Sequence, residues 1–215
     1  MKCIVTAGPT FEPLDEVRRL TNFSTGRLGT ELADFLISRG HEVTLLRGEQ
    51  ATWTQTSKAR ILPFTTTANL RDQLKAAANG VSAVFHAAAV SDFAFGKIWQ
   101  RAAGGELNPI KAGKISSRLK NVFAELVPTP KILAEMRDWL PQAFLVGWKF
   151  EVDGDRDGTI ADGRKQMAEC RTDACVVNGP AYGVGFGLLT KELHHCARKE
   201  DLFQQLAAIL PKRER

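Results

Sequence analysis

Apolar residues along this chain occur in two patterns, short runs and helical spacings. The short runs predict strands over residues 3–6, 42–46, 59–64, 83–89, 144–150 and 174–178, and a hairpin over 186–190 and 193–197. A spacing of i, i+4, i+7 and i+8 occurs at Leu28, Leu32, Phe35 and Leu36, and it predicts a helix over 28–38 that ends at Gly40. Similar spacings predict helices over 70–78, 130–139, 160–170 and 199–210, the first of them capped by Thr66 or Thr67.

The order of these elements predicts the fold class. Strands alternate with helices, and several strands are apolar on both faces, which is typical of an α/β protein with a three-layer, Rossmann-like, doubly wound and mostly parallel sheet. Ligands in such sheets lie beyond the carboxyl ends of the strands. The least regular stretch, 96–125, carries Gly104-Gly105, Pro109 and several lysines, and it predicts a flap or insertion. We therefore expect one nucleotide-binding domain over 1–215 with this flap inside it.

A glycine-containing segment, Asn22-Phe23-Ser24-Thr25-Gly26-Arg27-Leu28-Gly29, leads into the first predicted helix. Ser24 or Thr25 is expected to cap the helix, and glycines let a ligand approach the backbone. The free N–H groups and the positive dipole end of a helix N-terminus bind anions, most often phosphate. The segment predicts a site for a nucleotide or another phosphorylated molecule. The alternative for Gly29 is that it only permits close packing of the helix on the sheet.

The run from His86 to Phe93 is a second candidate site. Its small residues Ala87, Ala88 and Ala89 would let a ligand lie against the backbone, and Asp92 would then stand at the end of a strand. A carboxylate in that place can bind Mg²⁺ or a ribose hydroxyl, although Asp92 also suits a role in capping the next turn. His86 lies inside the apolar run and is expected to be a core histidine.

Two further strand ends and the flap carry polar or aromatic candidates. Trp148 could stack on a base and Asn178 could read a base edge through its amide, whereas the alternatives are core packing and a turn with Gly179-Pro180. Lys111 and Lys114 in the flap could neutralise a triphosphate or a departing pyrophosphate, or could be solvated surface lysines.

Composition narrows the class of protein. The net charge of +5 over 215 residues is modest and no tract focuses it, so Lys212-Arg213-Glu214-Arg215 is expected to be a solvated tail and no nucleic-acid partner is expected. None of the four cysteines is in C-x-x-C spacing, and Cys3 and Cys175 are expected to be core residues. No leader or long apolar span is visible, which predicts a cytoplasmic protein with no membrane contact.

Several segments in one order resemble phosphopantothenoylcysteine synthetase, the ligase of coenzyme A synthesis. The similar segments are Thr6-Ala7-Gly8-Pro9-Thr10-x-Glu12-Pro13-x-Asp15-x-Val17-Arg18, Thr21-Asn22-Phe23-Ser24-Thr25-Gly26-x-x-Gly29, Ala88-Ala89-Val90-Ser91-Asp92-Phe93 and Lys114-Ile115-Ser116-Ser117. The family joins 4′-phosphopantothenate to cysteine with CTP or ATP. The resemblance implies an acyl-nucleotidylate intermediate, a Mg²⁺ ion and a homodimer whose site is completed by the neighbour.

The resemblance also implies a role for each matching residue. Asn22 would hold the acyl centre, Lys114 would serve the flap, and Arg18 would meet the substrate phosphate, possibly across a dimer. The residues implied to cradle the triphosphate are Gly8, Ser24, Gly26 and Gly29. The residues implied to flank the base are Trp148 and Asn178. The residues implied to line the pantothenate side are Ala88, Ala89 and Asp92, the last also a candidate Mg²⁺ ligand.

The chain departs from the family pattern at several positions. Lys114-Ile115-Ser116-Ser117 stands where bacterial members have K-[IVL]-K-K, so Lys111 or Lys120 would have to replace the second lysine. Lys149 and the Ser-Ser pair are closer to the eukaryotic pattern, and CTP and ATP therefore both stay open. No flavin is expected, because the chain is too short to include the decarboxylase to which many bacterial members are fused.

Two other function classes are compatible with the element order. A short-chain NAD(P)-type reductase would share the fold, but G-x-G-x-x-G is missing and Tyr182, the only tyrosine, is not followed by Lys at Y-x-x-x-K spacing. A non-catalytic nucleotide- or nucleic-acid-binding module rests only on the mild positive charge.

Overall fold

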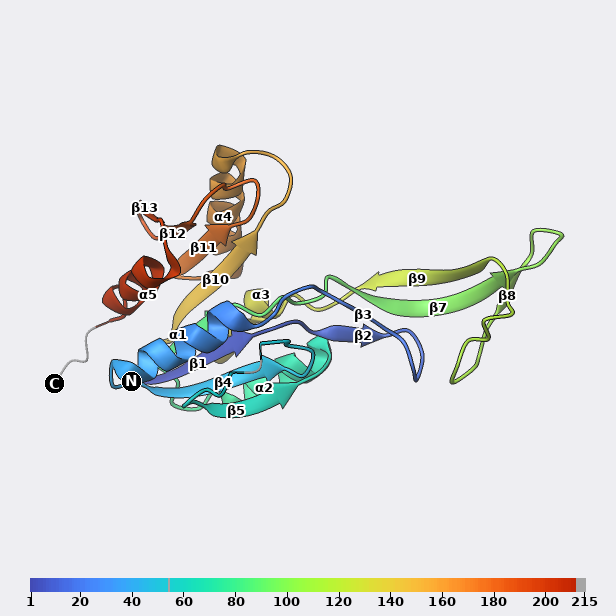
Figure 1. Ribbon diagram of the computed structural model, residues 1–215, viewed down its shortest axis with the longest axis horizontal. Helices are drawn as coiled ribbons and strands as arrows, with labels where there is room; N and C mark the ends of the chain where they lie inside the picture. The colour runs from blue at the N-terminus through green and yellow to red at the C-terminus, as the bar shows by residue number, and fades with distance from the viewer. Residues whose placement is uncertain (54, 212–215) are drawn as a thin grey trace.

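A central sheet of eight strands organises the chain (Figure 1) in a computed structural model that describes residues 1–53 and 55–211. The strand order is β13-β12-β11-β10-β6-β1-β4-β5. Six strands are parallel: β1 (Lys2–Ala7), β4 (Glu42–Gly48), β5 (Arg60–Phe64), β6 (Ala83–His86), β10 (Phe144–Phe150) and β11 (Ala174–Asn178). An antiparallel hairpin of β12 (Phe186–Leu189) and β13 (Leu193–Cys196) ends the sheet.

Helices cover both faces of this sheet, which confirms the prediction of a three-layer α/β fold. On one face α1 (Arg27–Ser38) and α5 (Lys199–Ala208) pack through Leu32, Leu36 and Leu202 on side chains such as Val5 and Phe85. On the other face lie α2 (Thr67–Ala77), α3 (Ile132–Trp139) and α4 (Arg156–Cys170). The sheet is buried on both faces because its central strands carry apolar side chains in both directions.

Several helix ends follow the predicted signals, and one begins earlier than predicted. Thr66 caps α2 by accepting a hydrogen bond from Asn69 N at 3.1 Å, as predicted, and Gly40 ends α1 with a φ of 83°. Helix α4 begins four residues before its predicted start because Asp155 caps it, accepting from Gly158 N at 2.8 Å. The predicted strand over 83–89 ends at His86.

A second, smaller sheet projects beyond the carboxyl edge of the central one. It consists of β7 (Phe93–Arg101), β8 (Leu107–Pro109) and β9 (Val122–Pro128), and we call residues 93–128 the arm. Beside it runs the β2–β3 hairpin, formed by β2 (Phe11–Pro13) and β3 (Arg19–Thr21), and both project to the same side (Figure 1). The stretch predicted to be irregular, 96–125, therefore lies in an antiparallel sheet with long loops.

Two further predictions concern the C-terminal residues and contact with a membrane. The solvated tail predicted over 212–215 lies outside the described residues. Across residues 1–53 and 55–211, the helices are all too short or too polar to span a bilayer.

Candidate active site

Two glycines meet at the mouth of α1. Gly8 follows β1 with a φ of 83°, and Gly26 precedes α1 with a φ of 78°. A Cβ atom placed on Gly26 would lie 3.3 Å from the Cα of Gly8 and 2.9 Å from the Cβ of Ala51. Both positions therefore need glycine, for their backbone conformation and for their contact. This arrangement brings the first strand and the first helix together as the phosphate-site prediction requires.

The predicted cap of α1 is wrong. Gly26 occupies the N-cap position in a left-handed conformation, and no side chain within residues 1–53 and 55–211 caps it. Thr25 Oγ1 instead accepts a weak hydrogen bond from Arg27 N at 3.3 Å, and Thr30 Oγ1 donates to Gly26 O at 2.8 Å. A Ser or Thr cap needs extended backbone at the capping residue, which Gly26 does not have. The mouth thus keeps first-turn amides that the helix itself cannot satisfy.

Gly29 has a packing role that the structure makes visible. A Cβ atom at this position would lie 2.7 Å from the Cβ of Ala7 and 2.9 Å from Thr6 O. The alternative of close helix–sheet packing therefore accounts for this glycine, and its contact with a triphosphate stays a prediction.

Asn22 is tied to the segment that follows β6. Its Nδ2 donates to Ala89 O at 3.1 Å, and Thr10 N donates to the same oxygen at 3.1 Å. Ala89 N in turn donates to Gly8 O at 3.0 Å. The chain leaves the β6 strand after His86 so that this segment can reach Gly8 and Asn22. Three predicted site residues from three distant segments therefore lie together at the carboxyl edge.

Asp92 lies next to this group and forms an ion pair with Lys131. Both side chains are largely exposed, so the pair contributes at most about 1 kcal/mol and a ligand can displace it at little cost. Within residues 1–53 and 55–211 there is no group of three or more His, Cys, Asp or Glu side chains that could hold a metal. The single carboxylate suits Mg²⁺ that takes most of its ligands from water and substrate phosphates.

The predicted base-binding residues lie on adjacent strands and carry unpaired polar atoms. Trp148 in β10 faces Val176, and Phe150 two positions later faces Asn178 at the end of β11. Trp148 Nε1 and Asn178 Oδ1 are buried, and neither has a hydrogen-bond partner within residues 1–53 and 55–211. Trp148 also packs against the core beneath α1 and α5, which was its alternative role. A buried donor and a buried acceptor without partners are costly unless a ligand satisfies them.

His86 and the two strand cysteines behave as core residues, as predicted. His86 is 7% exposed, and its Nδ1 lies 3.0 Å from Thr6 Oγ1, which accepts from Ala88 N at 3.0 Å. Burial lowers the pKa of His86 from 6.5 to about 4, so the ring is neutral at pH 7. Burial raises the pKa of Cys3 to about 11 and that of Cys175 to about 12, and both thiols stay protonated.

Arg18 and Lys114 lie away from this group within one subunit. Arg18 immediately precedes β3 and Asn22 immediately follows it, so the two residues flank opposite ends of this strand. Arg18 Nη2 donates to Ile115 O in the arm at 2.7 Å, which holds neighbouring Lys114 at the same distal end. The structure thus brings Arg18 and the flap lysine together and separates both from Asn22.

Two acidic residues of the first motif have structural roles that sequence reasoning left unassigned. Glu12 is buried and accepts from Thr67 N at the start of α2 at 2.9 Å. Asp15 Oδ2 accepts from Ile115 N in the arm at 3.0 Å. Asp is a favoured residue in Asx turns, but nothing in the sequence indicated that Asp15 also binds the arm.

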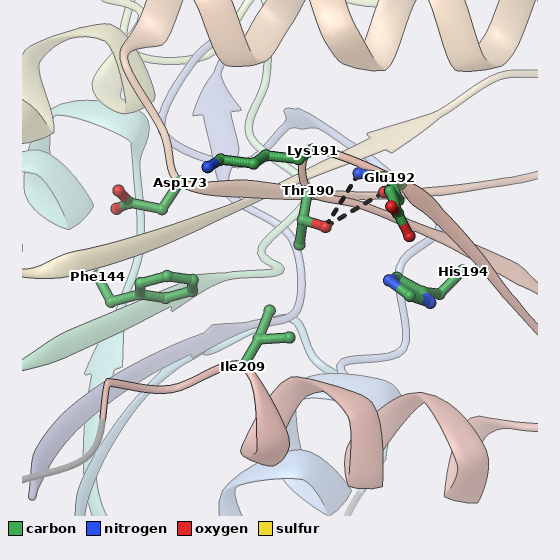
Figure 2. A pocket seen from close by; sticks show the side chains of 7 residues that line it. All are labelled: Phe144, Asp173, Thr190, Lys191, Glu192, His194 and Ile209. Carbon is green, nitrogen blue, oxygen red and sulfur yellow. Dashed lines mark hydrogen bonds between the residues drawn. The ribbon is translucent and has the colours of Figure 1, made fainter.

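Two cavities lie at opposite edges of the central sheet. One of about 430 Å³ lies beside the first turns of α1 and is lined by Thr25, Arg27, Leu28, Glu31 and Lys199. The other, of about 490 Å³ (Figure 2), lies at the amino edge and is lined by Phe144, Asp173, Thr190, Lys191, Glu192, His194 and Ile209. The second is lined by none of the predicted site residues, whereas the first adjoins the phosphate-site segment.

Comparisons with known proteins assign the chain to a family. A family model described as "DNA/pantothenate metabolism flavoprotein C-terminal domain" matches residues 1–209. The coenzyme A biosynthesis bifunctional protein CoaBC of Thermococcus kodakarensis is 31% identical over 179 residues, which are 82% of this chain and 41% of that protein. The chain thus spans about two fifths of the length of this relative.

Solved structures share the whole fold. The DNA/pantothenate metabolism flavoprotein from Streptococcus pneumoniae has a TM-score of 0.85 and 27% identity, with 97% of each chain covered. The Cab2 mutant H337A in complex with phosphopantothenate-cysteine has a TM-score of 0.74 at 19% identity and covers 97% of this chain and 85% of its own, a likeness of fold. The chain belongs to the family of the DNA/pantothenate metabolism flavoprotein C-terminal domain.

Proposed function

We propose that this chain is a ligase that joins 4′-phosphopantothenate to cysteine through an acyl-nucleotidylate. The observation that carries the proposal is the junction of Gly8, Gly26 and Asn22 at the mouth of α1, where Asn22 Nδ2 and Thr10 N share the carbonyl of Ala89. The family assignment and the coenzyme A relative support the same chemistry. The family does not favour the reductase alternative, and the single tyrosine, Tyr182, is buried and hydrogen-bonded to Arg156.

The reaction needs an activated carboxylate, because a free carboxylate cannot acylate an amine at neutral pH. The 4′-phosphopantothenate carboxylate attacks the α-phosphorus of the nucleotide and pyrophosphate leaves. The amine of cysteine then attacks the acyl carbon and the nucleoside monophosphate leaves with the bonding electrons. The backbone amides near Gly8, Ser24, Gly26 and Gly29 are suited to hold the phosphates, and Asn22 can stabilise oxyanion charge at the acyl centre.

The base of the nucleotide would lie against Trp148 and Asn178. Trp148 Nε1 would donate to the base or the ribose and Asn178 Oδ1 would accept from an exocyclic amine, which both cytosine and adenine carry. CTP and ATP therefore both fit this proposal. Mg²⁺ would be held by the nucleotide phosphates with Asp92 as a protein ligand, and it would neutralise charge on the departing pyrophosphate. Ala88 and Ala89 would line the pantothenate side.

A second copy of the chain would complete the site. The arm exposes Phe93, Leu107, Val122, Phe123 and Leu126, side chains that a partner would bury. Arg18 and Lys114 lie at the distal end of the hairpin and arm, where a neighbour's nucleotide and substrate phosphate would meet them. We propose a homodimer in which the single domain 1–215 supplies Asn22 to one site and its flap, 96–125, to the other, in the cytoplasm.

Pyrophosphate release tests the ligase proposal. The purified chain is incubated with 4′-phosphopantothenate and cysteine, separately with CTP and with ATP, each with Mg²⁺. We expect release with one nucleotide or both, and formation of 4′-phosphopantothenoylcysteine only when cysteine is present. Absence of release with both nucleotides would reject the ligase, and saturable NADPH binding in the same preparation would favour a reductase.

Mixed subunits test the shared site. Asn22→Asp and Lys114→Ala chains are each poorly active alone, and a heterodimer of the two contains one site with both changes and one with neither. Two-fold symmetry then predicts about half of the wild-type activity per heterodimer. A heterodimer as inactive as its parents would show that Asn22 and Lys114 act within one subunit.

A further inference from the structure

Asp15 joins the β2–β3 hairpin to the arm with its two oxygens divided between two tasks. Oδ1 accepts from Val17 N at 3.0 Å and from Arg18 N at 2.8 Å, which forms the hairpin turn. Oδ2 accepts from Arg18 Nε at 3.0 Å and from Ile115 N in the arm at 3.0 Å, and it also pairs with Arg18 Nη2. One carboxylate therefore fixes the local turn and a segment 100 residues later.

The arm segment is held on both sides of Lys114. Ile115 donates to Asp15 and accepts from Arg18 Nη2 at 2.7 Å, while Gly113 O accepts from Glu16 N at 2.9 Å. Lys114 thus lies between two anchored residues, and its backbone direction is set by the hairpin. Before this segment the arm is held by its own pairing, since β8 pairs with β7 and Ile110 N donates to Ile98 O at 2.8 Å, whereas residues 111–121 are mostly exposed.

Burial and charge show that these contacts are not ordinary surface contacts. The side chain of Asp15 is 1% exposed and Ile115 is 5% exposed, although the strands around them are mostly exposed. The hydrogen bond from Arg18, together with those from the amides of Ile115, Val17 and Arg18, holds the pKa of Asp15 well below its usual range despite desolvation. A charged, hydrogen-bonded carboxylate of this kind strongly constrains the groups that donate to it.

We propose that Asp15 is a positioning residue that acts through Ile115 and Arg18 to present Lys114 and Arg18 as one rigid unit. The proposal rests on the proposed function, in which Lys114 and Arg18 meet phosphates. Without the Oδ2 contacts, the hairpin would hold this stretch of the arm through fewer hydrogen bonds, among them the one from Glu16 N to Gly113 O, and Lys114 would move more freely. Presenting two cations at a fixed spacing lowers the ordering cost of binding a triphosphate and a substrate phosphate together.

Asp15→Asn separates the two tasks of the carboxylate. Asn is favoured in Asx turns, so its side-chain oxygen keeps the Val17 and Arg18 amides, while its NH₂ group faces the donors of Ile115 and Arg18. The matched control is Asp201→Asn, because Arg198 and Asp201 form the same i, i+3 pair without contact to the arm. Circular dichroism is used to check that both variants are folded.

Limited trypsin digestion tests the contacts of Asp15 Oδ2 with Ile115 and Arg18, which we call the Asp15 clasp. This test does not depend on enzymatic activity of the chain. Trypsin cleaves after Lys111 and Lys114, and the bond after Lys114 is protected by buried Ile115. We expect cleavage at these two sites to be at least about tenfold faster in Asp15→Asn, since hydrogen bonds to a charged group are lost, and unchanged in Asp201→Asn. Unchanged cleavage in a folded Asp15→Asn chain would overturn the proposal. If that variant fails to fold, Asp15→Glu shifts the carboxylate by one methylene and is judged by the same criterion.

A double-mutant cycle distinguishes positioning from general stability. Asp15→Asn is expected to slow pyrophosphate release about tenfold in the wild-type background and by a clearly smaller factor in Lys114→Ala, because one of the two cations that Asp15 positions is gone. Losses that multiply in the double variant would reject positioning. If the wild-type chain releases no pyrophosphate, the ligase proposal fails and the trypsin result alone decides whether the clasp exists.

Discussion

Strands β6 and β9 belong to one chain but bury very different shares of their residues. All four residues of β6 are buried between the two helical layers, whereas six of the seven residues of β9 are exposed. The central sheet is therefore stabilised by apolar burial, and the arm by backbone pairing and a few charged contacts such as the Asp15 clasp. The predicted site residues Trp148 and Asn178 lie on the central sheet, whereas the predicted flap lysine, Lys114, lies in the arm.

The largest effect on stability is expected when a phenyl ring is removed from the central sheet. Phe85 is fully buried in β6, and Phe85→Ala is expected to lower the free energy of unfolding by about 3–5 kcal/mol through lost burial and an added cavity. Urea denaturation followed by circular dichroism measures it. A loss below 1 kcal/mol would mean that the core is not packed as described.

A substitution at Asn22 should slow amide formation, the second step of the proposed reaction. Asn22→Asp is expected to leave pyrophosphate release in place and to slow amide formation about 100-fold or more, since an oxyanion donor is replaced by a carboxylate. Quenched-flow assays of the two products separate the steps. Loss of pyrophosphate release as well would contradict the role given to Asn22.

The two regions should also respond differently to acid. His86 in the central sheet has its pKa lowered to about 4, so its stabilising contribution is present above pH 6.5 and is lost as the pH falls from 6.5 to 4, about 3 kcal/mol in all. The pKa of Asp15 is also lowered, so the clasp persists to pH values below the usual Asp range. In His86→Leu, the free energy of unfolding should depend less steeply on pH between pH 4 and 6.5. Cleavage of the arm by a protease that is active in acid should be the same in this variant as in the unmodified chain.

The smallest effect is expected for the aromatic side chain of the arm. Phe123 is 40% exposed and lies 4.3 Å below the Arg101 guanidinium, so Phe123→Ala should cost less than about 1 kcal/mol of monomer stability. Sedimentation velocity should nevertheless show weaker self-association, because the same ring is proposed to be buried by the partner. Unchanged self-association would show that Phe123 lies outside the dimer interface.

The central sheet could be predicted from the sequence because burial leaves a clear pattern. Val5, Phe85 and Leu145 lie in apolar runs, and Leu32 and Leu36 repeat at helical spacing, so their strands and helix lie close to the predicted bounds. The pairing of β7 with β9 left no such signal, since neither strand has a fully buried residue and neither alternates apolar and polar residues.

The site was partly predictable for a related reason. Gly8 and Gly26 have backbone conformations that favour glycine, and a glycine at a given position can be read directly in the sequence. The bond between Asn22 and Ala89 depends on how two segments 67 residues apart are brought together, and the Oδ2 contact of Asp15 depends on a separation of 100 residues. Neither leaves a periodic trace in the chain, and the left-handed conformation of Gly26 also excluded the expected Ser24 or Thr25 cap.

The carbonyl of Ala89, which receives two donors from the start of the chain, has a consequence for biosynthesis. A nascent chain that ends before this residue has no acceptor for Asn22 Nδ2 and Thr10 N. In the proposed ligase, the orientation of Asn22 is therefore fixed by a residue that the ribosome adds 67 positions later.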